Sequence, residues 1–148
     1  MKASFVHLHL HTEYSIVDSV VRVRDLMTTT AAAQMPAVAL TDQNNLFALV
    51  KFYRAALKAG IKPIVGAEIW LQTHADDCTE GHSNGNPDGS PSRLILLCRN
   101  NEGYRNLSRL LTRGYLEGQR DGIPVINRDW LQADATAGLM ALSGAREG

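Results

Sequence analysis

The sequence predicts an α/β fold in which parallel strands alternate with helices. Short apolar runs flanked by helix-breaking residues recur along the 148 residues, as expected for buried strands. Between several of these runs, apolar residues repeat every three or four positions, which is typical of amphipathic helices. The order strand, helix, strand, helix, strand gives two βαβ units with right-handed crossovers. With 45% apolar residues, the chain can bury one core, so we expect a single domain over residues 1–148.

The first expected strand carries histidines. It runs over residues 5–12, and because successive side chains of a strand point to opposite faces, His7, His9 and His11 share one face. Residues two apart lie about 7 Å from each other along a strand, so neighbouring histidines can bind the same metal ion. The alternative is a half-buried strand whose histidines only face solvent.

Two helices and two strands are expected next. The first helix covers residues 28–34 and is entered through residues 20–27, and a buried strand covers residues 37–40. The second helix ends at Gly60. We expect its apolar repeat to face the core, and the repeat consists of Leu46, Leu49, Val50, Tyr53 and Leu57. A strand over residues 63–71 completes the second βαβ unit.

Residues 73–92 interrupt this alternation. They consist mainly of Gly, Ser, Asn, Asp and Pro, too polar to pack, so we expect a mobile surface loop inside the domain. His74 and His82 lie in this loop without a neighbouring ligand pattern, and we interpret both as solvated.

The second half continues with three strands and two helices. The strands are expected over residues 94–98, 123–126 and 138–143, and the helices over 102–116, capped by Asn100 or Asn101, and 128–133. Arg105, Arg109 and Arg113 lie four apart on the outer face of the longer helix. Like charges repel at this spacing, so the stripe suits either an anionic partner or a solvated face.

The chain is expected to be part of a longer protein. Its last strand has no helix after it, which is an unusual end for an α/β protein. Sheet edges that lack their native partners then expose apolar surface and favour self-association.

Composition excludes several classes of protein. The 15 basic and 15 acidic residues balance, which argues against a strongly nucleic-acid-binding surface. No window is long and apolar enough to span a membrane, and no leader precedes the first strand, so we expect no membrane partner and a cytoplasmic location. Cys78 lies in the polar loop and Cys98 in an apolar run, which is typical of reduced thiols rather than a disulfide.

The polar residues at the ends of the strands predict a metal site. In parallel α/β proteins the chemistry gathers at the carboxyl ends of the strands. A His-x-His pair with carboxylates from neighbouring strands is typical of a multinuclear centre that activates water against a phosphoester. The residues in such positions are His9, His11, Asp18, Asp42, Glu68 and Ser143.

Several ordered runs of the sequence carry a family resemblance, namely Phe5–Ser15, Leu40–Asp42 with Asn45 and Leu46, Lys51–Tyr53, Gly60–Gly66, Asn101–Leu107 and Gly138–Gly144. These runs resemble the polymerase-and-histidinol-phosphatase (PHP) domain at the N-terminus of the alpha subunits of bacterial replicative DNA polymerase III. The resemblance covers nearly the whole chain, and it implies the N-terminal part of an irregular (β/α)7 TIM-like barrel at the head of a much longer polymerase.

The resemblance also implies a metal site with missing ligands. Family ligands are replaced here by Gln43, Arg93 and Ala145. Gln43 is a weak neutral ligand, Arg93 adds a positive charge, and Ala145 offers no donor atom. We therefore expect a decayed site with zinc or manganese at low occupancy at most. The family's metal positions that remain are His9, His11, Asp18 and Glu68.

Two classes of function follow from the resemblance. In the first, the chain is the head of a DNA-directed DNA polymerase and carries no catalytic residue, because the nucleotidyl-transfer carboxylates and their Mg²⁺ belong to a later domain. It then serves as a scaffold that binds the proofreading exonuclease and other replisome subunits, and it reaches DNA through the full-length chain. In the second, it is a metal-dependent phosphoesterase or 3′–5′ exonuclease. The lost ligands favour the first, because metal affinity falls steeply when a shared cluster is disrupted.

Overall fold

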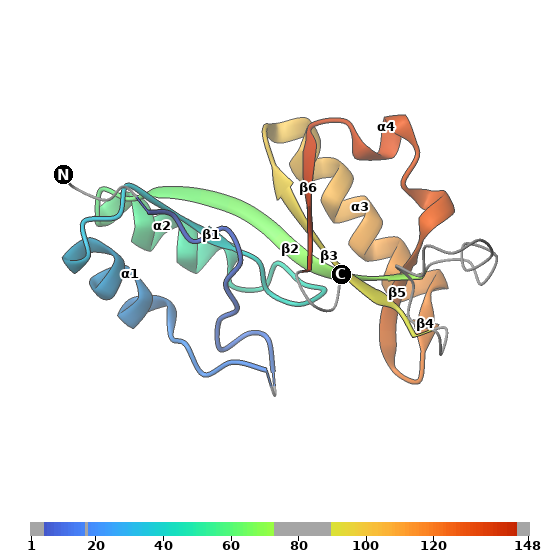
Figure 1. The fold of residues 1–148 in the computed structure, drawn as a ribbon, viewed down its shortest axis with the longest axis horizontal. Coiled ribbons are helices and arrows are strands. Elements are labelled where there is room, and N and C mark those ends of the chain that lie inside the picture. Colours follow the sequence, from blue (N-terminus) through green and yellow to red (C-terminus); the bar gives the residue numbers. More distant parts are fainter. Residues whose placement is uncertain (1–4, 17, 73–89, 145–148) are drawn as a thin grey trace, which may run out of the picture. The chain divides into compact units, whose positions relative to one another are not determined.

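The computed structural model of this protein describes residues 5–16, 18–72 and 90–144 (Figure 1). Two compact units divide the chain, and we call Met1–Ala67 unit 1 and Glu68–Gly148 unit 2. Both contain helices and strands, so the predicted α/β class is confirmed.

Some expectations from the sequence fall outside the described residues. One is the expected mobile surface loop, as far as residue 89, with the expected solvated His74 and His82 and reduced thiol of Cys78. The other is the expected missing metal ligand at Ala145.

Unit 1 is built on one βαβ unit and one additional helix. Strand β1 (Ala37–Leu40) leads through helix α2 (Leu49–Lys58) into β2 (Lys62–Gln72), whose first residues pair with β1 in parallel. Helix α1 (Val23–Ala32) precedes them and packs against α2 (Figure 1). All residues of β1 are buried, as in a strand covered on both faces. The predicted strand–helix–strand order is confirmed here.

Helix α1 begins earlier than the sequence predicts, at Val23, and ends at Ala32. Residues 28–30 are threonines, which form helices poorly. Packing outweighs this preference, because the buried side chains repeat at helical spacing. They are Val23, Leu26, Met27 and Thr30.

One narrow face of α2 packs into the hydrophobic core of unit 1. Phe52 and Ala56 are fully buried, whereas Val50 and Leu57 are 63% and 58% exposed. The prediction that the apolar repeat of this helix faces inward is therefore wrong. Phe52 and Ala56 lie one turn apart on one side of the helix, and the small alanine allows the helix to approach its neighbours closely.

The histidine-bearing segment is not a regular strand. His7 forms an isolated bridge with Val38 of β1, and the amides of Ala39 and Thr41 donate to the carbonyl oxygens of His7 and Leu10 at 2.8 and 3.0 Å. The chain bends after this pair, and Leu8, expected on a buried face, is 39% exposed. The prediction of a strand over residues 5–12 is therefore wrong, because these few backbone contacts do not hold the segment in an extended form.

The sheet of unit 2 has the strand order β4-β5-β2-β3-β6. Its further strands are β3 (Ser92–Cys98), β4 (Gln119–Arg120), β5 (Ile123–Asn127) and β6 (Leu139–Ser143). Strand β5 pairs with β2 in parallel, but β3 with β6 and β4 with β5 are antiparallel pairs. The expectation of parallel strands is wrong for these two pairs.

The antiparallel pair of β4 and β5 is a hairpin with no helix between its strands. A parallel connection needs a dozen or more residues and usually contains a helix. Only Asp121 and Gly122 separate β4 from β5, and their φ angles of 50° and 81° suit the tight turn of a hairpin. Strands β3 and β6 are separated in the chain by residues 99–138, so no tight turn sets the direction of this pair.

Helix α3 (Asn101–Glu117) packs on β5 and β3. The side-chain oxygen of Asn100 accepts a hydrogen bond from the amide of Gly103 at 2.9 Å, which confirms the predicted cap. A Cβ on Gly103 would lie 2.0 Å from the carbonyl oxygen of Gly138, so only glycine allows this close contact.

Two short helices follow, η2 (Arg128–Trp130) and α4 (Ala133–Thr136). No helix within the described ranges is long and apolar enough to cross a bilayer.

The thiol of Cys98 at the end of β3 is expected to react slowly with alkylating reagents. Cys98 is a free cysteine, and burial raises its pKa to about 11 because desolvation disfavours the thiolate. In a Cys78→Ala background, iodoacetamide at pH 8 should modify it about a hundredfold more slowly than free cysteine. Because folding raises this pKa, the free energy of unfolding should fall as the pH rises from about 8.5 towards 11. Alkylation at the rate of free cysteine would show that the site is open to water.

Candidate metal centre

The corner formed by Thr41 and Asp42 after β1 holds the histidine segment in place. The hydroxyl oxygen of Thr41 accepts from the amide of Leu10 at 2.7 Å and donates to its carbonyl oxygen at 3.0 Å. The fully buried carboxylate of Asp42 accepts from the amide and hydroxyl of Thr12 at 2.6 and 2.8 Å. It also accepts from the hydroxyl of Ser15 at 2.8 Å. These three donors satisfy a carboxylate that would be costly to bury alone, so Asp42 anchors the segment.

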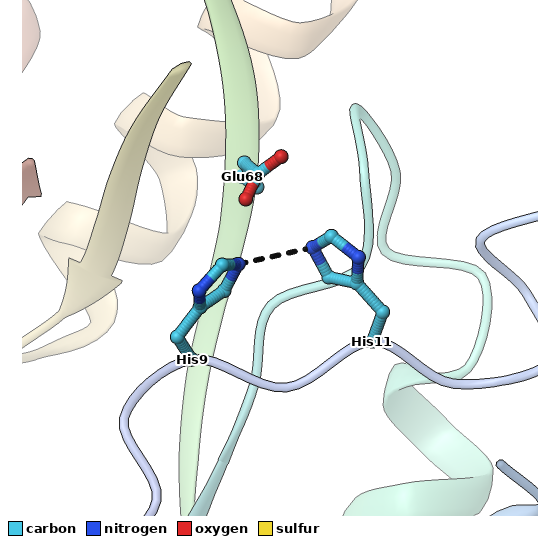
Figure 2. Close-up of side chains that lie close together, drawn as sticks. All are labelled: His9, His11 and Glu68. Atoms are coloured by element: carbon cyan, nitrogen blue, oxygen red, sulfur yellow. Dashed lines mark hydrogen bonds between the residues drawn. The ribbon is translucent and has the colours of Figure 1, made fainter. Parts of the chain in front are cut away.

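His9 and His11 point their Nε2 atoms at each other. These two nitrogen atoms lie 3.3 Å apart, and the ring planes are inclined by 80° (Figure 2). Two imidazole ligands of a tetrahedral ion, each about 2.0–2.1 Å from the metal, also lie about 3.3–3.4 Å apart. The separation therefore suits two ligands of one small ion.

The carboxylate of Asp18 contacts the other nitrogen of His11, Nδ1. A carboxylate only accepts, so Nδ1 carries the proton, and in the neutral form of this tautomer Nε2 is the nitrogen with a free lone pair for a metal. Metal-binding histidines are commonly oriented by such a contact. Asp18, predicted as a ligand, contacts Nδ1 of His11 in the structure and can orient this ring.

A second contact fixes the turn after the histidines. The ammonium of Lys51 on α2 lies 3.0 Å from the carboxylate of Glu13 and 5.4 Å from the ring centroid of Tyr14. The hydrogen bond with Glu13 raises the pKa of Lys51 above its usual value. This pair joins the segment to α2 at the surface, where its energetic contribution is small.

In unit 2, Glu68 lies on β2 and is fully buried; Figure 2 shows its side chain on this strand. Its carboxylate forms an ion pair with the guanidinium of Arg93, with Oε1 and Nη1 3.2 Å apart. The guanidinium also lies over the ring of Trp70, 4.6 Å from its centroid, and the amide of Gly144 donates to the carbonyl oxygen of Arg93 at 3.0 Å. Arg93 is thus held by contacts of both its backbone and its side chain. Its positive charge lies beside the carboxylate of Glu68, which the sequence predicts as a metal ligand.

In the structure, His11 contacts both His9 and Asp18. Glu68 instead forms an ion pair with Arg93. At Gln43, the backbone amide donates to the hydroxyl of Ser15 at 3.0 Å. Thr12 and Ser15, which anchor the segment, are not among the residues that the sequence predicts for the site. A signal exists for them, because a buried aspartate at a strand end requires nearby donors.

Comparison with known proteins identifies relatives along the whole chain. Residues 7–148 match the family model of the PHP domain. DNA polymerase III subunit alpha of Pseudomonas fluorescens is 53% identical over 148 residues, which are 100% of this chain and 12% of that protein. The same subunit of Escherichia coli (strain K12) is 42% identical over 146 residues, 97% of this chain and 11% of that protein. The chain therefore spans about an eighth of the length of these relatives.

Two solved structures have a similar fold. One is described as a metal-dependent phosphoesterase from Bifidobacterium adolescentis, with a TM-score of 0.51 and 15% identity. The other is described as an amidohydrolase from Chromobacterium violaceum, with a TM-score of 0.51 and 18% identity. Each match covers 74% of this chain and 32% of the other. At these identities the similarity concerns the fold alone.

Proposed function

Because this chain belongs to the PHP domain family, we propose that it forms the head of a DNA polymerase III alpha subunit and acts there as a scaffold with a decayed metal centre. The ion pair between Glu68 and Arg93 is the observation that carries this proposal. A guanidinium keeps its charge at all physiological pH values, so it acts as a permanent counter-ion for this carboxylate.

The fixed position of Arg93 supports the loss of metal binding. A cation that approaches the carboxylate must displace the guanidinium or lie beside it, and like charges repel strongly at short range. Displacement would also break the stacking on Trp70. A buried carboxylate without its partner is costly, so the ion pair and a metal ion compete for Glu68.

A reduced capacity for metal remains at the histidines. His9 and His11 each offer one nitrogen atom of a type that zinc accepts, and the separation of their Nε2 atoms supports one ion at the two imidazoles. We propose that these two imidazoles hold one weakly bound zinc or manganese ion, with His11 oriented by Asp18, and that Glu68 is withheld from metal by its ion pair with Arg93.

The longer protein supplies the polymerase chemistry in this proposal. Identity of 53% over the full chain to an alpha subunit supports DNA-directed DNA polymerase activity for the intact protein, with its Mg²⁺ site beyond this segment. Replisome subunits are then the partners, among them the proofreading exonuclease, in the cytoplasm of a bacterium. Balanced charge on this segment agrees with contact to DNA through other domains.

An active phosphoesterase is the second candidate function. The 3.3 Å separation of the Nε2 atoms favours it, because it suits ligands that converge on an ion. A metal-bound water could then attack a phosphoester. The candidate requires Glu68 to be released from Arg93.

Assays with added metal discriminate between the two candidates. We expect no hydrolysis of p-nitrophenyl phosphate, and no shortening of a 3′-labelled oligonucleotide, above the rate of a His9→Ala, His11→Ala double variant in Mn²⁺ or Zn²⁺. The double variant removes both imidazoles, so it reports adventitious activity and contaminants. Metal-stimulated hydrolysis that the double variant abolishes would establish the phosphoesterase instead.

A further inference from the structure

We propose that a pocket in unit 2 binds a peptide segment in which a carboxylate side chain lies beside an aliphatic one. The pocket, called here the α3–α4 pocket, has a volume of about 280 Å³. Its walls come from α3, η2 and α4, and none of its residues belongs to the metal centre. The residues that matter for recognition are Arg109, Leu110, Arg113, Trp130, Asp134 and Ala135.

The pocket is held in shape by Asn106. The side-chain amide of this buried residue donates to the carbonyl oxygens of Asp134 and Ala137, at 3.1 and 3.0 Å. These bonds fix the backbone of α4 against α3. A pocket that exists before its ligand arrives binds with a smaller loss of conformational entropy.

One wall combines a cation with an aromatic ring. The guanidinium of Arg113 lies over the ring of Trp130, 4.1 Å from its centroid, and its Nε donates to the carboxylate of Glu117 at 2.8 Å. Arg113 is thus already balanced by a carboxylate. With Leu110 and Ala135, the ring forms the apolar part of the pocket, which suits an aliphatic side chain.

Arg109 is the cation placed to bind the ligand. Within the described part of the chain, its guanidinium donates one long bond, 3.4 Å to the side-chain oxygen of Asn106. A guanidinium has five N–H donors in a planar fork that matches a carboxylate. Arg109 therefore has donors for a ligand carboxylate at the pocket.

The charge balance favours a peptide over a nucleic acid. Asp134 lines the pocket and Glu117 lies beside Arg113, so the two arginines face two carboxylates. A polyanion would meet both carboxylates, whereas one carboxylate can approach Arg109 while a peptide N–H donates to Asp134. The volume of about 280 Å³ lies just below the usual range for drug-sized ligands and suits one or two side chains.

Nuclear magnetic resonance of the two tryptophan indole N–H groups tests this proposal on the 148-residue protein. The probe is acetyl-Glu-Leu-amide. We expect saturable shifts of the Trp130 indole signal and of the Leu110 and Ala135 amides. Trp70, which lies on β2, should not shift and serves as the internal control. Acetyl-Gln-Leu-amide should bind about tenfold more weakly, because it lacks the charge that Arg109 recognises.

Two variants on one face of α3 make the test specific. Arg109→Ala should weaken binding of acetyl-Glu-Leu-amide about tenfold. Arg105→Ala removes the same charge one turn away, outside the pocket, and should change binding less than about twofold. An unchanged Trp70 signal shows that each variant is folded. Equal weakening by both variants, absence of a saturable shift, or tighter binding of thymidine 5′-monophosphate than of the dipeptide would overturn the proposal.

Discussion

Replacing Asp42 by alanine is expected to lower the free energy of unfolding by about 3–5 kcal/mol. The substitution removes the carboxylate that accepts three hydrogen bonds from Thr12 and Ser15. It leaves these donors without a partner in a buried place, where each costs about 1–3 kcal/mol. Urea unfolding followed by circular dichroism measures the loss.

Asp25→Ala provides the matched control for this prediction. Asp25 is an exposed aspartate on α1, and its replacement should change stability by less than about 0.5 kcal/mol. Asp42→Asn should fall between the two, because an amide keeps one acceptor oxygen. A loss below about 1 kcal/mol for Asp42→Ala would show that the histidine segment does not depend on this anchor.

Replacing Gln43 and Arg93 together by histidine is expected to raise zinc affinity about ten- to a hundredfold. The change removes a permanent positive charge from Glu68 and supplies two imidazoles, the residue types that the family resemblance implies at these positions. Competition titration against a chromophoric chelator measures the affinity at pH 7.5, where histidine is largely neutral.

Single variants separate the two contributions to zinc affinity. Arg93→His alone should give most of the gain, because it also releases Glu68. Arg99→His introduces a histidine at an exposed position after β3 and should leave zinc affinity unchanged. If the double variant binds zinc no better than the parent protein, positions 43 and 93 do not face the histidines and the proposed ligand set is incorrect.

The elements that the sequence predicts well have strong local signals. Strand β1 has the predicted bounds, Ala37–Leu40, because an apolar run between breakers can only be buried. Helix α3 begins near its predicted cap because Asn100 satisfies a free amide of the first turn. Both depend on neighbouring residues alone.

The elements that the sequence predicts poorly depend on distant neighbours. The alternation of residues 5–12 indicates a strand, but a strand needs a partner along its length, and only His7 has one in β1. Similarly, α2 contains two apolar stripes, and local sequence does not tell that the one with Phe52 is buried while Val50 is exposed. Strand direction also depends on the whole sheet, as the antiparallel pair of β3 and β6 shows.

The candidate site shows the same division. The resemblance indicates which residues are replaced, and the charge of Arg93 follows directly from its type. In the structure the guanidinium of Arg93 pairs with Glu68 and stacks on Trp70. This arrangement depends on packing between residues far apart in the sequence, so the sequence alone does not predict it. The roles of Asp42 and Asp18 differ for the same reason, since one anchors the backbone and the other orients His11.

Elemental analysis of the protein, purified without added metal and dialysed against metal-free buffer, tests the decayed metal centre most directly. With Glu68 bound by Arg93 and only His9 and His11 paired among the described residues, we expect well below one equivalent of zinc or manganese per chain. Two or more equivalents that survive dialysis, and that Arg93→His does not increase, would contradict the account and indicate an intact multinuclear centre.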